Sequence, residues 1–82
     1  MQFNLQQQAS HRNLSYIVKK KIALRILSGE FVAESILPGE NELCEIYNVS
    51  RTAIREAVKM LTAKGMLLAR PRIGTRVMPK SY

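Results

Sequence analysis

Three side chains that can bind a polyanion stand close together in the second half of the chain: Arg51, Thr52 and Arg55. If this stretch is helical, Arg51 and Arg55 lie one turn apart, because an α-helix has about 3.6 residues per turn. A guanidinium donates through a planar fork that fits either a phosphate or the O6 and N7 edge of guanine. The spacing therefore fits contact with a nucleic acid through the first turns of a helix, although these residues alone more often form an ordinary solvated surface.

The same stretch has the pattern of an amphipathic helix. Its apolar residues recur at the spacing i, i+3, i+4 and i+7, which gives a helix one buried stripe. They are Ile54, Ala57, Val58 and Leu61. Ser50 can cap the N-terminus through its hydroxyl, and Gly65 can end the helix in the left-handed conformation. We therefore predict a recognition helix over about residues 50–64, although a solvated surface helix would show the same pattern.

Charge is distributed unevenly along the chain. The 82 residues carry a net charge of +7 and are 46% hydrophobic, which fits one folded domain and not a disordered tail. Residues 1–29 hold five basic side chains and no acid, and residues 30–50 hold five glutamates and no base. Residues 51–82 hold eight basic side chains against Glu56 alone. Such a basic half is typical of a nucleic-acid surface, and an anionic membrane surface also fits it.

Residues that are rare in the sequence argue against several function classes. Cys44 is the only cysteine, so no intramolecular disulfide can form, and no Cys and His residues stand at metal-ligand spacing. His11, the only histidine, has no nucleophile spaced to it, so we expect no enzyme. The sequence contains no secretion signal and no membrane-spanning run. We therefore expect a cytoplasmic protein without membrane contact, and with no metal or cofactor in this part of the chain.

The N-terminal part predicts an arm followed by a helix. Residues 1–12 are polar and are expected to form a flexible arm. A helix is expected to begin at Asn13 or Ser15 and to end at Ser28–Gly29. Its apolar residues are Leu14, Ile17, Val18, Ile22, Ile26 and Leu27. Lys19–Lys21 would lie on its wet side, as solvated charges or as phosphate contacts.

A second, short helix is predicted just before the recognition helix. Gly39 stands at its N-cap position, and Glu40 and Glu42 suit the positive end of the helix dipole. Its expected buried side consists of Leu43, Ile46 and Tyr47. A short turn then leads into the helix capped by Ser50, and two helices joined in this way make a helix-turn-helix.

After the recognition helix, two short extended runs are joined by a turn at Pro71–Gly74. They predict a hairpin wing with a basic tip at about residues 70–77. The expected fold is thus mainly α with a small β-hairpin: a winged helix-turn-helix of three helices and a two- to three-stranded wing, at residues 13–78. Residues 79–82 would begin a linker.

In the order and spacing of these segments, the chain resembles the DNA-binding domain of the GntR family of bacterial transcription regulators, in particular its FadR-like branch. The matching segments include Leu37–Leu43, Val49–Ala57 and Arg70–Val77. Two motifs together make the match specific: Ser-Arg-Thr-x-x-Arg-Glu-Ala and the wing sequence Gly-Thr-x-Val. The resemblance covers about residues 14–78.

The resemblance implies contacts with double-stranded DNA. It implies base or phosphate contacts from the three residues that open the recognition helix, with Arg55 favoured for guanine, and a close approach of Gly74 to the minor groove. Four further cations would neutralise phosphates. The full set of predicted DNA-binding residues is Arg51, Thr52, Arg55, Lys59, Asn41, Arg70, Arg72, Gly74 and Arg76. Gly39 and Asn41 depart from the Ser and Arg that are common in the family, so DNA contact at Asn41 is the least supported of the set.

The resemblance also implies features beyond these residues. Members of the family continue into a C-terminal domain that binds an effector, often a carboxylate or a sugar acid, and that holds a homodimer on an inverted repeat. A repressor is expected. The alternative is a winged-helix module that binds a protein or an RNA, because the same fold serves all of these partners.

Overall fold

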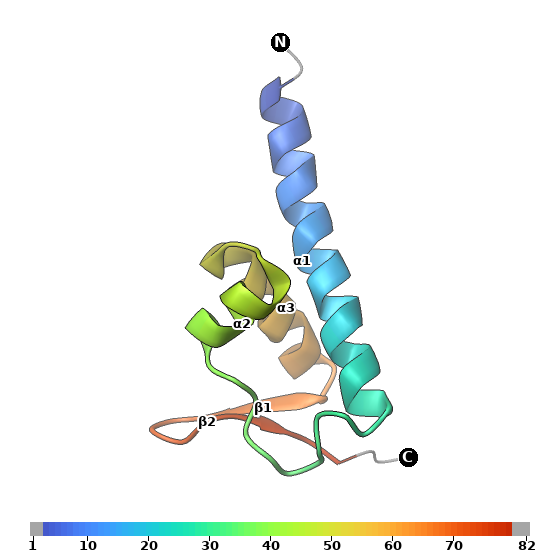
Figure 1. The fold of residues 1–82 in the computed structure, drawn as a ribbon, viewed down its shortest axis with the longest axis vertical. Helices are drawn as coiled ribbons and strands as arrows, with labels where there is room; N and C mark the ends of the chain where they lie inside the picture. Colours follow the sequence, from blue (N-terminus) through green and yellow to red (C-terminus); the bar gives the residue numbers. More distant parts are fainter. Residues whose placement is uncertain (1–2, 80–82) are drawn as a thin grey trace.

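The computed structural model describes the backbone of residues 3–79 and the side chains of residues 13–79. Its elements follow in the order α1 (Phe3–Leu27), α2 (Glu40–Tyr47), α3 (Arg51–Ala63), β1 (Leu67–Arg70) and β2 (Gly74–Val77). Figure 1 shows α1 as one long helix whose C-terminal half lies beside α3, with the hairpin at the far end of α3. These elements form the winged helix-turn-helix that the sequence predicts.

The first helix is longer than expected. The predicted start at Asn13 or Ser15 is wrong, because the backbone is helical from Phe3. Residues 3–12 contain no Gly or Pro, so nothing in them ends a helix that has formed further along the chain. The flexibility expected for residues 1–12 stays a prediction, and residues 1–2 and 80–82 lie outside the described residues.

The ends of the two later helices follow the predicted caps. Gly39 precedes α2 in an extended conformation, with φ −64° and ψ 166°, and provides no side-chain cap. The Ser50 hydroxyl accepts a hydrogen bond from the backbone N–H of Ala53 at 3.3 Å, and so caps α3. Gly65, at φ +79°, follows the last turn of α3 in the left-handed region, as predicted.

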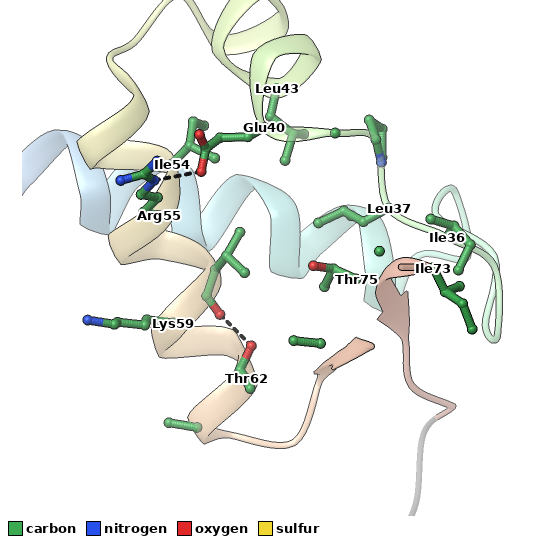
Figure 2. Close-up of a pocket in the computed structure, with 16 residues that line it drawn as sticks. Ile36, Leu37, Glu40, Leu43, Ile54, Arg55, Lys59, Thr62, Ile73 and Thr75 are labelled. Atoms are coloured by element: carbon green, nitrogen blue, oxygen red, sulfur yellow. Dashed lines mark hydrogen bonds and ion pairs between the residues drawn. The ribbon is translucent and has the colours of Figure 1, made fainter. Parts of the chain in front are cut away.

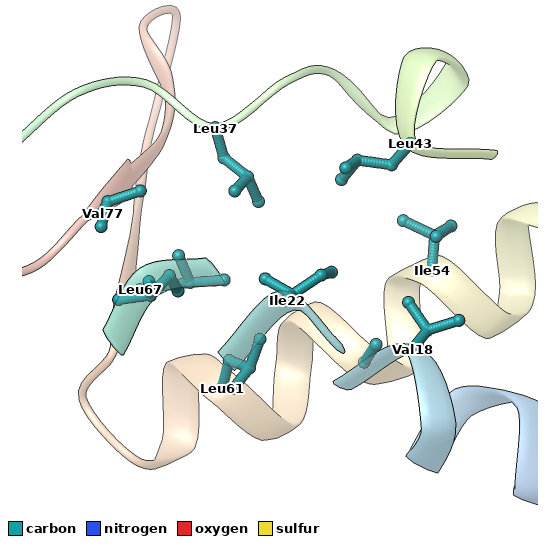
Figure 3. Packing of buried hydrophobic residues seen from close by; sticks show 10 residues of the cluster. Val18, Ile22, Leu37, Leu43, Ile54, Leu61, Leu67 and Val77 are labelled. Carbon is teal, nitrogen blue, oxygen red and sulfur yellow. The ribbon is translucent and has the colours of Figure 1, made fainter. Parts of the chain in front are cut away.

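Ten buried residues from the three helices, the hairpin and the segment before α2 form the core (Figure 3): Val18, Ile22, Ile26, Leu37, Leu43, Ile54, Ala57, Leu61, Leu67 and Val77. Some predicted core positions lie elsewhere. In α1, Leu14, Ile17 and Leu27 are exposed, because only one face of that helix touches α3. In α2, Ile46 is also exposed, since a helix of eight residues covers the core with little more than Leu43.

The wing is an antiparallel pair in which Leu67 lies opposite Val77 and Arg70 lies opposite Gly74. Residues 34–37 extend this sheet along the other edge of β2. The N–H of Leu37 donates to the carbonyl of Thr75 at 2.7 Å, and the N–H of Val77 donates to the carbonyl of Ser35 at 2.9 Å. The wing therefore has two strands and one isolated bridge, between Ile36 and Arg76, in agreement with the predicted two to three strands.

Candidate nucleic-acid interface

The exposed face of α3 carries all four of its residues that the sequence assigned to DNA binding. They are Arg51, Thr52, Arg55 and Lys59, and all are exposed. The opposite face is buried through Ala53, Ile54, Ala57 and Leu61. Because the buried stripe fixes the rotation of α3 on the core, the cationic face is held outward. Figure 2 shows Arg55 and Lys59 projecting from the same side of the helix.

An ion pair joins the start of α2 to this face. Nε of Arg55 donates to Oε2 of Glu40 at 2.8 Å. This hydrogen bond, together with the charges of Arg55 and Arg51, lowers the pKa of Glu40, and the same bond raises the pKa of Arg55. From the sequence, Glu40 is expected only to interact with the helix dipole. Its partner stands 15 residues away, a separation at which no local pattern signals a contact.

A groove of about 890 Å³ lies between α3, the start of α2 and the wing (Figure 2). It brings together three of the predicted DNA-binding residues: Arg55, Lys59 and Gly74. Its lining also includes residues that sequence reasoning did not select, among them Thr62, Ile73 and Thr75. Cations therefore lie on the α3 side of the groove, whereas the wing side is formed by small and apolar groups.

Two of the three predicted wing cations, Arg70 and Arg76, line a second, smaller hollow of about 260 Å³ together with Ile36 and Ile73. Glu34 also lines it and accepts a hydrogen bond from Nη2 of Arg76 at 3.4 Å. Arg76 is thus partly neutralised by an acid. Arg70 lies beside the same hollow and is exposed.

Three residues, Pro71, Arg72 and Ile73, form the turn at the wing tip, and all are exposed. Arg72 adopts φ +69° and is exposed, and Ile73 is 62% exposed. An apolar side chain so open to water at the tip was not identified from the sequence, because the hairpin pattern does not show which turn residue projects.

Gly74 is required by the fold itself. It adopts φ +117°, and a Cβ at this position would lie 3.2 Å from Cγ2 of Ile36. The sequence-based reason for a glycine here was its closeness to DNA, and that contact stays a prediction. Asn41, the last of the predicted residues, is exposed on the first turn of α2 beside Glu40.

The described part of the chain contains no group of three or more His, Cys, Asp and Glu side chains that could hold a metal ion. Cys44 is a free thiol and is partly buried. No helix in residues 3–79 is long and apolar enough to cross a membrane. The predicted DNA-binding side chains on this surface carry guanidinium, ammonium, hydroxyl and amide groups, which can donate hydrogen bonds to a polyanion.

Comparison with known proteins shows that the chain is similar to bacterial transcription regulators. The model of the gntR family of bacterial regulatory proteins matches residues 14–77. The uncharacterized HTH-type transcriptional regulator YieP of Escherichia coli (strain K12) is 63% identical over 81 residues, which are 99% of this chain and 35% of that protein. The probable fructoselysine utilization operon transcriptional repressor of the same organism is 41% identical over 68 residues, which are 83% of this chain and 28% of that protein. The chain thus spans about a third of the length of these relatives.

Solved structures agree with the sequence relatives. The DNA-binding domain of AraR, in complex with operator ORR3, matches with a TM-score of 0.74 and 34% identity, over 78% of this chain and 77% of that chain. The GntR protein of Streptococcus agalactiae matches with a TM-score of 0.71 and 33% identity, over 80% of this chain and 32% of that chain. Since the family model matches most of its residues, the chain belongs to the gntR family of bacterial regulatory proteins.

Proposed function

We propose that this chain binds double-stranded DNA sequence-specifically, as the operator-binding domain of a bacterial transcription regulator. The observation that carries the proposal is the outward face of α3, where Arg51, Thr52, Arg55 and Lys59 are exposed on a helix anchored by its buried stripe. The similar domain of AraR is bound to operator DNA, which supports the same partner class here.

In this proposal α3 lies in the major groove and the wing lies at the minor groove, the docking geometry of a helix-turn-helix with a wing. Arg55 contacts guanine, and Arg51 and Thr52 contact neighbouring bases or phosphates. Lys59, with Arg70, Arg72 and Arg76 of the wing, neutralises phosphates. The groove between α3 and the wing faces the sugar–phosphate strand that separates the two DNA grooves.

One such domain contacts only a few base pairs, so a specific site requires two copies. We propose a homodimer of the full-length protein on an inverted repeat, because a two-fold operator matches a two-fold dimer. A repressor whose effector, a carboxylate or a sugar acid, binds a separate C-terminal domain is proposed in the same way. The FadR-like branch and the cytoplasmic location stay predictions, and no catalytic step is part of the proposal.

The test is selection of duplexes from a random pool with two copies of the domain joined by a long flexible linker, which replaces a dimer. We expect an inverted repeat whose half-site contains guanine. Random recovered sequences, together with a steep salt dependence, would contradict specific recognition and leave only charge attraction. A protein or RNA partner would then be the better candidate.

A further inference from the structure

Glu40 is an acidic residue on a surface that is proposed to meet a polyanion. Its side chain is 35% exposed, and its carboxylate lies next to the guanidinium of Arg55, which is 66% exposed. A carboxylate at this place repels DNA phosphates, so it lowers affinity for DNA of any sequence. A glutamate at this position is therefore expected to have a favourable effect that offsets the loss of affinity.

The geometry of the contact suggests that reason. The carboxylate binds Nε of Arg55, which leaves the two terminal Nη nitrogens of the guanidinium for a base. A flexible arginine loses rotamer entropy when it binds, whereas a guanidinium that is already held in one plane loses less. Figure 2 shows the two side chains facing each other across the corner between α2 and α3.

Both ends of the ion pair are attached to fixed backbone. Glu40 is the first residue of α2, whose N-terminal turn is closed by the hydrogen bond from the N–H of Leu43 to the carbonyl of Gly39 at 2.9 Å. Leu43 is 1% exposed, and so is Ile54, the residue before Arg55. The core therefore fixes the distance between the two helices, and the ion pair aims the guanidinium relative to α3.

We propose that Glu40 is a positioning residue for base recognition: it orients Arg55 toward guanine, so that it increases sequence preference while it decreases affinity for DNA in general. The inference rests on the proposed function, because it requires Arg55 at a base. The Glu40 carboxylate, whose pKa lies below its ordinary value of 4.5, is ionised at neutral pH, where the effect applies. Glu40 thus raises the discrimination between bases by positioning Arg55, and it lowers the affinity for all DNA by repelling phosphates. Both quantities can be measured.

The experiment compares Glu40→Ala and Glu40→Gln with Glu56→Gln in the linked two-copy protein. The control removes the same charge from an exposed position of α3. Dissociation constants are measured for the selected duplex, for the same duplex with its guanine replaced, and for a scrambled duplex. We expect Glu40→Ala to bind the scrambled duplex more tightly than wild type does, and to lose at least about fivefold of the discrimination at guanine. Glu56→Gln should change all three affinities by one common factor. Glu40→Gln retains an acceptor oxygen and should keep an intermediate discrimination.

A double variant separates positioning from an independent role. If Glu40 acts through Arg55, then Glu40→Ala combined with Arg55→Ala discriminates no worse than Arg55→Ala alone. A further loss in the double variant would overturn the inference. The inference would also be overturned if Glu40→Ala discriminated at guanine as well as wild type does while Arg55→Ala did not. In that case the proposed function would stand. A wild-type protein without any preference would instead contradict both. Circular dichroism of each variant confirms that it is folded before binding is measured.

Discussion

Ile36 lies against the position where Gly74 lacks a side chain: a Cβ on Gly74 would stand 3.2 Å from Cγ2 of Ile36. The contact joins the loop before α2 to the first residue of β2. It shows that the glycine of the wing has a structural role before any DNA is present. Strain and crowding act at the same residue, since its φ of +117° is one that L side chains rarely adopt.

Gly74→Ala should therefore destabilise the free domain. A non-glycine residue in such a conformation costs about 1–3 kcal/mol, and the contact with Ile36 adds to the cost. The measurement is urea unfolding in the absence of DNA. Adding Ile36→Ala should recover only the part that is due to crowding, because the backbone strain remains. Equal stability of Gly74→Ala and wild type would show that the glycine is needed only at DNA.

Leu61→Ala should unfold much of the protein at ambient temperature. The side chain is 1% exposed in the core, and truncating a buried leucine costs about 2–5 kcal/mol, a large share of the stability of a small domain. Leu24→Ala provides the control, since Leu24 is 66% exposed on α1 and should change the free energy of unfolding by less than about 0.5 kcal/mol. Thermal melting followed by circular dichroism measures both variants.

Arg55→Ala and Lys59→Ala should weaken binding in different ways. Both residues line the groove between α3 and the wing, but only Arg55 is held by a carboxylate in the described structure. We expect Arg55→Ala to reduce the preference for guanine. Lys59→Ala should weaken binding to all duplexes by a similar factor and lower the slope of log K against log salt by about 1. An unchanged preference in a folded Arg55→Ala variant would exclude Arg55 as the base contact.

The ion pair also predicts how stability responds to pH. The pKa of Glu40 is lowered from its ordinary value of 4.5, because Arg55 donates to the ionised carboxylate. Folding therefore gains from this group above the pKa of the unfolded chain, and the gain is lost as the pH falls through the lower pKa of the folded state. The difference in melting temperature between wild type and Glu40→Gln should stay constant from neutral pH to about pH 5 and shrink below it. A difference that grows on acidification would contradict this assignment.

Much of the fold could be predicted because its signals are local. The cap at Ser50, the glycine after α3 and the apolar spacing of α3 each depend on a few neighbouring residues. The start of α1 could not be placed, because a residue such as Ser15, which can cap a helix, also fits inside one. The sequence allowed a third strand in the wing but not its identity, because residues 34–37 and their partners in β2 lie some 40 residues apart and only the packed core brings them together.

The residues of the candidate site also differ in whether local sequence signals predict them. The outward cations of α3 follow from helical periodicity, and the structure places all of them as expected. Glu40 and Glu34 instead have arginine partners that are 15 and 42 residues away in the chain. A sequence gives the charge of these acids but not their partners. The sequence therefore identifies the donors of the interface better than it identifies the groups that hold them.

The hydrogen bonds from residues 34–37 to β2 have a mechanical consequence. Leu37 is bonded to Thr75 of the wing, and only Pro38 and Gly39 separate it from Glu40. A wing that is pushed outward by a wide minor groove would pull on this short connection, and through Glu40 on the guanidinium of Arg55. We therefore expect the width of the minor groove at the wing to influence the position of the Arg55 guanidinium in the major groove.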